Sequence, residues 1–358
     1  MTGNTQKQIF RLFGLVISIL LLCGINLPAA QEKISPLSDF QYKKDFAQYD
    51  GIKKEADAQK RADLLLAYLK ERPISKLLLN AVNDYLECVK PQKDPAKAGS
   101  MIETLIAAIP TEQTIKAAEI PVGVEEFTKE QLVPSQKIAL SSLATIYYQA
   151  KNYPKAAETL EKIYAMAPDK SLLPVLADVY KQFNADKYIT YAQKILTESP
   201  IEQSYGTALD LAQFQIQKND LKAAIELYSK VMNVYGEKVP PGVQEPAWNA
   251  TRAFAYGLIA SGIYTTKDYP KAIEAYGKVT NFDSKREDAY YFIGMSKWQT
   301  KDQAGAIESF AKCVVLNGPT YGAKAKTYME QLYKAEHNGS TDGIDKVLAK
   351  ATSELGIK

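Results

Sequence analysis

The segment Ala272-Ile273-Glu274-Ala275-Tyr276-Gly277-Lys278 is matched by a second segment, Ala306-Ile307-Glu308-Ser309-Phe310-Ala311-Lys312, with residues of the same type at most positions. The two blocks begin 34 residues apart, and each follows a short polar turn. Related blocks begin at Ala156 and Ala224, which are 68 residues apart, or two such periods. Self-similarity at a fixed period of this length is typical of repeat architectures. The sequence therefore predicts an array of one repeated supersecondary unit.

Each block has the pattern of the second helix of a helix pair. A small residue is followed four positions later by a large one, as in Ala272 and Tyr276. We expect the alanine to let two helices approach closely while the large side chain fills the space beside it. Before the turn, apolar residues four apart, such as Leu143 and Tyr147, indicate a first helix. One such pair cannot bury both of its faces, so neighbouring pairs must stack.

Four features together resemble the tetratricopeptide repeat: the period, the close-packing alanine, a proline after the second helix, and a small residue in the first helix. Those small residues are Ala144, Ala177, Ala212, Ala260 and Gly294. The resemblance covers residues 137–318. It departs from the family pattern where Gly236, Ser284 and Gly318 replace the proline and Tyr188 replaces a small residue. It implies an all-α, right-handed superhelical solenoid of stacked antiparallel helix pairs. Together with the N-terminal segment described below, it indicates a repeat protein of the exported bacterial type.

The domain organisation follows from the extent of the repeats. We expect a signal peptide at 1–30, degenerate helical repeats at 31–136, an array of about five tetratricopeptide repeats at 137–318, and capping helices at 319–358. Within the second part, helices are expected over 62–69, 76–89 and 96–109, each followed closely by a proline. Residues 111–136 contain Pro121, Gly123 and Pro134, and we expect an irregular connection there.

The N-terminal segment predicts export. Lys7 and Arg11 precede an apolar run from Leu12 to Leu27, which ends in small residues. This order is typical of a secretory signal peptide. The run is shorter than the roughly 20 apolar residues of a spanning helix, which favours a cleaved signal peptide. An uncleaved membrane anchor is the alternative. We therefore expect the chain in the periplasm or cell envelope of a bacterium, at the membrane only if the segment is uncleaved.

Composition and charge narrow the function class. Apolar residues make up 46% of the chain and charged residues 24%, which excludes wholesale disorder and a multi-span membrane protein. Without residues 1–30, 42 basic residues face 41 acidic ones, so nothing indicates nucleic acid as a partner. His337 is the single histidine. We expect Cys88 and Cys313 to be buried free thiols, although export would also permit a disulfide.

No catalytic motif is present, and the glutamates of the repeats recur with a lysine four positions on, as in Glu274 and Lys278. Such recurrence indicates a solvated helix face, whereas a catalytic carboxylate would occur once. The sequence therefore predicts a non-enzymatic protein without cofactor or metal. An enzyme with a site in residues 36–136 is the weaker alternative.

The predicted functional surface is the concave face lined by the first helix of each pair. Aromatic and amide side chains on that face suit a peptide, because rings give apolar contact and amides bond to backbone groups. We therefore predict a scaffold or adaptor that binds a protein or peptide partner there. The alternatives are a module binding substrate or cell-wall glycan through the same rings, and rings that merely pack against the next repeat. The candidate residues are Tyr148, Gln149, Lys181, Gln213, Gln217, Tyr264, Tyr291, Trp298 and Gln299.

Overall fold

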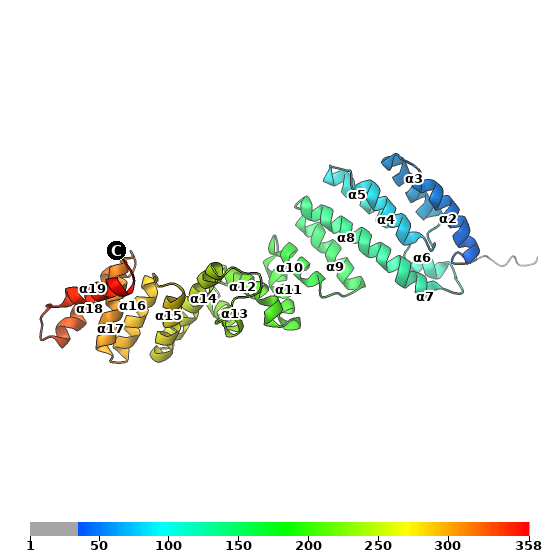
Figure 1. The fold of residues 1–358 in the computed structure, drawn as a ribbon. Coiled ribbons are helices and arrows are strands. Elements are labelled where there is room, and N and C mark those ends of the chain that lie inside the picture. Colours follow the sequence, from blue (N-terminus) through cyan, green and yellow to red (C-terminus); the bar gives the residue numbers. More distant parts are fainter. Residues whose placement is uncertain (1–34, 358) are drawn as a thin grey trace, which may run out of the picture. The chain divides into compact units, whose positions relative to one another are not determined.

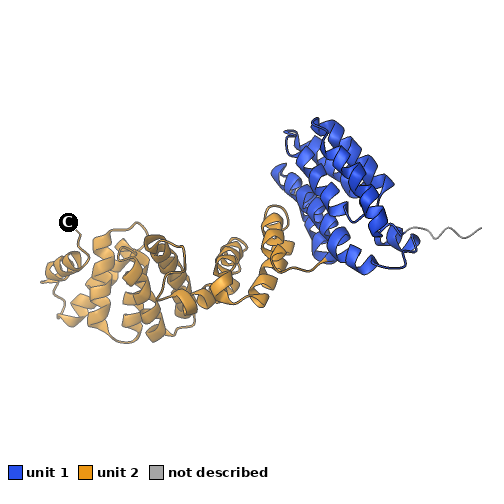
Figure 2. Cartoon of the chain, turned by 45° about the vertical axis from the view of Figure 1, so that its right-hand side comes forward, with its two compact units in different colours: residues 1–166 blue, residues 167–358 orange. Residues whose placement is uncertain are grey.

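The computed structural model describes residues 35–357, and this part of the chain consists of helices and their connections, without strands (Figure 1). The predicted all-α class, built from stacked helix pairs, is confirmed. The described part divides into two compact units, one ending at Met166 and one beginning at Ala167 (Figure 2). No described helix is long and apolar enough to cross a membrane. The predicted signal peptide, residues 1–30, lies outside the described residues.

The first unit packs its helices around one apolar core (Figure 1). Both α4 and α5 pack against α8, which pairs with α9. Leu65, Leu78 and Leu105 lie fully buried between these helices. The elements are α2 (Asp39–Lys53), α3 (Ala58–Glu71), α4 (Leu78–Val89), α5 (Pro95–Ala108), α6 (Glu112–Ala117), α7 (Val124–Phe127), the π-helical turn η1 (Thr128–Leu132), α8 (Val133–Gln149) and α9 (Tyr153–Met166).

The expectation of an irregular connection over 111–136 is wrong. Helices α6 and α7, the turn η1 and the start of α8 occupy most of it, and only residue 111 and residues 118–123 lack helix. Pro134 is the second residue of α8 and directly follows the π-helical turn η1, so the helical run continues through it. Phe127 and Leu132 are buried in the core of the first unit, so burial of these side chains supports helical structure across the segment.

The second unit is a succession of helix pairs followed by two further helices (Figure 1). Each helix from α10 to α17 packs against the next one, and α19 also packs against α17. The boundary between the units falls inside segment 137–318, and the domain limits expected from the sequence stay a prediction. The elements are α10 (Leu172–Lys181), α11 (Ala185–Glu198), α12 (Ile201–Gln217), α13 (Leu221–Tyr235), α14 (Glu245–Thr265), α15 (Tyr269–Phe282), α16 (Glu287–Gln299), α17 (Gln303–Leu316), α18 (Gly322–Glu336) and α19 (Ile344–Glu354).

The polar turn between the helices of a pair has the same conformation in successive repeats. Lys267 and Lys301 both adopt a left-handed backbone, with φ of 64° and 67°. The following aspartate caps the second helix: Asp302 accepts a hydrogen bond from the backbone N–H of Gly305 at 2.9 Å. Asp268 caps α15 in the same way. The Lys-Asp dipeptide thus ends one helix and starts the next.

The predicted close contact between helices is confirmed. The block alanines, Ala156, Ala224, Ala272 and Ala306, are all 0% exposed. The opposing first helix is equally tight at Gly294, where an added Cβ would lie 2.7 Å from the ring of Phe310. A small residue is therefore required there because the neighbouring ring already fills the space.

Two glycine substitutions test this contact. Gly294→Ala should destabilise the protein by about 1–3 kcal/mol, because the rigid Phe310 ring must move. Gly277→Ala is the matched control on α15, where an added Cβ meets nothing within 4 Å. It should stabilise by about 0.5–1 kcal/mol, the usual gain over glycine inside a helix. Urea unfolding measures both, and shifts of the same sign would contradict the packing.

Candidate functional site

The first-helix face of the second unit is the surface formed by α10, α12, α14 and α16. It carries most of the predicted partner residues. Tyr148 and Gln149 are also exposed, but they end α8 in the first unit. The ring of Tyr148 lies 5.6 Å from that of Tyr153. The predicted residues therefore divide between two units that are described separately. Those in the second unit are Lys181, Gln213, Gln217, Tyr264, Tyr291, Trp298 and Gln299.

Polar residues on α10 and α12 already bond to neighbouring helices. Lys181 Nζ lies 2.7 Å from Asp210 Oδ2, which joins α10 to α12. Gln213 Nε2 donates to the hydroxyl of Tyr228 on α13 at 2.8 Å. Gln217 is exposed at the end of α12. Lys181 and Gln213 thus help to fix the face, and Gln217 offers its amide to solvent.

The aromatic residues at the other end of the face are half-buried. The ring centroid of Tyr264 lies 5.0 Å from that of Phe292, and Trp298 lies 5.5 Å from Tyr328. Edge-on and tilted contacts at these distances are favourable. Burial is the main cause that raises the pKa of Tyr264 above its ordinary value. These rings are held rigidly and keep one edge at the surface, while Gln299 beside them is exposed.

Tyr291 corrects the prediction, because it is a core residue. Only 9% of it is exposed, and its ring lies 4.6 Å from that of Tyr321 and 6.0 Å from that of Phe310. Burial raises the pKa of Tyr291 to about 12. Tyr321, immediately before α18, and the packing of Tyr328 from α18 cover the ring. Tyr291 therefore packs against Tyr321 and α18. This agrees with the alternative that some of the rings pack against the following repeat instead of binding a partner.

Phe254 is a surface residue that the sequence analysis missed. It is 42% exposed on α14, and its ring lies edge-on to Tyr228 at 5.7 Å. A signal was available in the repeat frame. Thr265 stands seven residues before Ala272, as Gln299 stands before Ala306, and Phe254 precedes Thr265 by 11 residues. That spacing is about three helical turns, so both residues share one face.

A charged pair lies beside Gly257 of α14, three residues after Phe254. Arg286 donates from Nε and Nη2 to the two carboxylate oxygens of Asp288, at 2.8 and 2.6 Å. This bond is the main cause that raises the pKa of Arg286. The guanidinium lies beside Gly257, where an added Cβ would be 3.3 Å from Nη2. The first-helix face therefore combines an exposed ring with a paired, half-buried cation.

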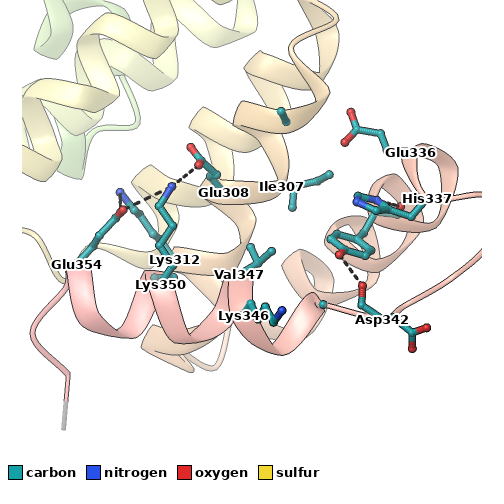
Figure 3. Close-up of a pocket in the computed structure, with 14 residues that line it drawn as sticks. Ile307, Glu308, Lys312, Glu336, His337, Asp342, Lys346, Val347, Lys350 and Glu354 are labelled. Atoms are coloured by element: carbon teal, nitrogen blue, oxygen red, sulfur yellow. Dashed lines mark hydrogen bonds and ion pairs between the residues drawn. The ribbon is translucent and has the colours of Figure 1, made fainter.

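A hollow lies among α17, α18 and α19, with a volume of about 590 Å³ (Figure 3). The apolar residues of α19 face inward, with Ala351 buried and Ile344, Val347 and Leu348 half-buried. Lys350 Nζ lies 2.6 Å from Glu308, and Lys312 Nζ lies 2.7 Å from Glu354 (Figure 3). These ion pairs are exposed, so they contribute little. Helix α19 is therefore held mainly by its apolar stripe.

Two alanines on α19 test how this helix is held. Ala351→Glu buries a carboxylate against α17 and should release α19, because an unpaired buried charge is costly. Ala349→Glu is the matched control, since Ala349 is exposed on the same helix. Hydrogen exchange should accelerate over 344–354 in the first variant alone, with α16 and α17 unchanged. Equal exchange in both variants would show that the stripe does not hold the helix.

The described residues, 35–357, contain two cysteines, Cys88 and Cys313. Cys88 and Cys313 are buried free thiols, as expected. Burial raises the pKa of Cys313 to about 12, aided by the charges of Glu287 and Asp288. Arg61 Nε donates to Cys88 Sγ at 3.2 Å. Within this part of the chain, no group of His, Cys, Asp or Glu side chains is placed to hold a metal ion.

Comparison with models of known protein families gives one match. Residues 287–318 match the family model of the tetratricopeptide repeat. The chain therefore contains a tetratricopeptide repeat. The matched residues are one complete unit, namely α16, its turn and α17. No curated protein sequence gives a significant match.

Several solved structures resemble the chain. The TPR2AB domain of yeast Sti1, in a complex with pHSP90, is 14% identical, covers 88% of this chain and 100% of its own, and has a TM-score of 0.34. A tetratricopeptide repeat protein from Parabacteroides merdae is 13% identical, with 82% and 99% covered and a TM-score of 0.33. Naa15/Naa10 bound to HypK-THB is 11% identical, with 89% and 43% covered and a TM-score of 0.47. The likeness to the tetratricopeptide repeat rests on the matched residues 287–318 and the 34-residue period around them.

Proposed function

We propose that this tetratricopeptide repeat protein is a non-enzymatic, exported scaffold that binds a segment of another protein on its first-helix face. The observation that carries the proposal is Phe254, a large ring 42% exposed on a rigid helix and braced by Tyr228. Aromatic side chains, phenylalanine included, are enriched in the buried centre of protein–protein interfaces. The exposed amides of Gln217 and Gln299 support a peptide partner, since amides can pair with extended backbone.

The mechanism is binding alone. The helices of the face are fixed by buried alanines and by bonds such as that from Gln213 to Tyr228. A preformed surface lowers the ordering cost of association on one side of the complex. An apolar side chain of the partner would pack on Phe254, and its backbone would reach the flanking amides. Export is proposed on the sequence of residues 1–30, and it would place this binding in the periplasm or cell envelope of a bacterium.

Phe254→Ala tests the binding face. The variant should weaken capture of the partner about tenfold, the loss expected for one central aromatic contact. It should keep its helicity, because Phe254 is largely outside the core. The measurement is quantitative cross-linking in cells, followed by identification of the captured proteins with the unmodified chain as reference.

Leu221→Ala is the matched control, since Leu221 is also exposed but begins α13, the second helix of its pair. It should capture as much partner as the unmodified chain. Phe254 is a cleaner probe than Tyr264 or Trp298, whose rings also pack on neighbours. Unchanged capture by Phe254→Ala, or binding of glycans without any protein partner, would refute the proposed face.

Export has its own test. N-terminal sequencing of the mature protein should begin near Gln31, because the residues before it are small, as cleavage requires. Cell fractionation should place that product outside the cytoplasm. A chain that starts at Met1 in the cytoplasmic fraction would refute export. It would not contradict the proposed binding of a partner on the first-helix face.

A further inference from the structure

Helix α2 forms one edge of the first unit (Figure 1). Its inner face is fixed by polar contacts as well as apolar ones. Asp45, 1% exposed, accepts a hydrogen bond from Ser75 Oγ at 2.8 Å and another from Gln41 Nε2 at 2.7 Å. Tyr49, also buried, donates to Asp84 Oδ2. The bonds to Ser75 and Asp84, which lie outside α2, fix the rotation of the helix and determine which residues point outward.

The outer face of α2 has a symmetric pattern. Six residues lie along this face, and in chain order they are acidic, basic, aromatic, small, acidic and basic. The intervals between successive members are four, three, one, three and four residues. The ring of Phe46 is 48% exposed at the centre of this pattern. The steps read the same in both directions, and each acidic residue has a basic counterpart at the mirrored place. The six residues are Asp39, Lys43, Phe46, Ala47, Asp50 and Lys54.

We propose that this face of α2 docks the same face of a second copy of the chain, with the two helices antiparallel. Reversal of the partner helix places Lys43 opposite Asp50 of the second copy, and Asp39 opposite Lys54 of the second copy. The two Phe46 rings then meet at the two-fold axis. A parallel arrangement would oppose like charges at every position, so charge complementarity selects the antiparallel dimer.

Contacts within the chain do not satisfy this face. Lys43 has no ion-pair partner among residues 35–357. Asp50 pairs with Lys54 at 2.7 Å and Asp39 with Lys76 at 3.1 Å, both at the surface. Exposed pairs of this kind hold little energy and exchange partners readily. Antiparallel docking also sets the N-terminus of each α2 beside the C-terminus of the other, which is favourable for the helix dipoles.

The size of the face sets the expected strength. A single-helix interface lies at the low end of specific interfaces, below about 1,200 Å² in total. We therefore expect a weak dimer whose population rises with protein concentration and falls with salt. Another protein or another segment of the chain on this face would instead leave the purified protein monomeric.

Sedimentation velocity of the purified full chain tests the dimer through exchanged charges. Lys43→Glu and Asp50→Lys should each raise the dimer dissociation constant about tenfold or more, because each opposes like charges twice. An equimolar mixture of the two variants should restore association. In the mixed dimer the carboxylate introduced in one chain faces the ammonium introduced in the other, and the remaining Lys43 faces the remaining Asp50. Lys44→Glu is the control, since Lys44 lies one residue away on a different side of α2, above the ring of Phe40.

The design separates docking from damage to the fold. A misfolded single variant could not regain association on mixing, and circular dichroism of each variant checks helicity directly. Restoration in the mixture, with Lys44→Glu unaffected, would establish the antiparallel α2 interface. A chain that is monomeric at all concentrations, a mixture that does not associate, or equal disruption by Lys44→Glu would overturn the proposal.

Discussion

The close approach of two helices at a residue without a large side chain is the contact on which the second unit depends. Each block alanine is fully buried, and at Gly294 the neighbouring Phe310 ring is so near that no further carbon fits without displacement. The large residue four positions on, such as Phe310, then fills the space beside the contact. Because this geometry joins only two helices, each pair leaves an apolar side that another pair must cover. The array follows from that requirement.

The same packing decides which aromatic residues belong to the surface. Tyr291 and Trp298 stand on the same helix, seven residues apart, and both were expected to face a partner. Tyr321 and Tyr328 close over Tyr291, whereas Trp298 keeps part of its ring in solvent. A ring on the first helix is therefore core or surface according to how the following helix is placed. The first-helix face is what the core leaves uncovered.

The sequence predicted the fold where the period is strict and less of it elsewhere. The pairs from α12 to α17 were expected because the alanine blocks fix both helices and the turn. Helical repeats were expected across 31–136, but the individual helix over 39–53 was not delimited. Phe46 points outward while Tyr49 and Ile52 point inward, so the apolar residues of this helix give no single stripe. The segment 111–136 was misjudged because Pro134 was counted as a break although it starts α8.

Residues of the candidate site could be predicted where the same position, counted from the block alanine, is exposed in successive helix pairs. Positions seven before the block alanine, Gln217 and Gln299, are exposed as expected. Phe254 obeys the same frame three turns earlier and could have been found. Tyr291 could not have been excluded, since the covering residue Tyr321 lies 30 positions away, beyond the next helix. Long-range cover of this kind depends on tertiary packing and has no local pattern.

Helix α2 shows how a buried polar group can determine an exposed surface. Asp45 is costly to bury, and its hydrogen bond from Ser75, which lies outside α2, offsets part of that cost in one rotational setting of the helix. A rotation that turned Phe46 inward would expose more of Asp45 but would break that bond and the one from Tyr49 to Asp84. An apolar inner face would tolerate such a rotation, because hydrophobic contact has no fixed direction. The polar contacts therefore hold Lys43 and Asp50 outward, and the charge pattern of the outer face is a consequence of hydrogen bonds on the inner one.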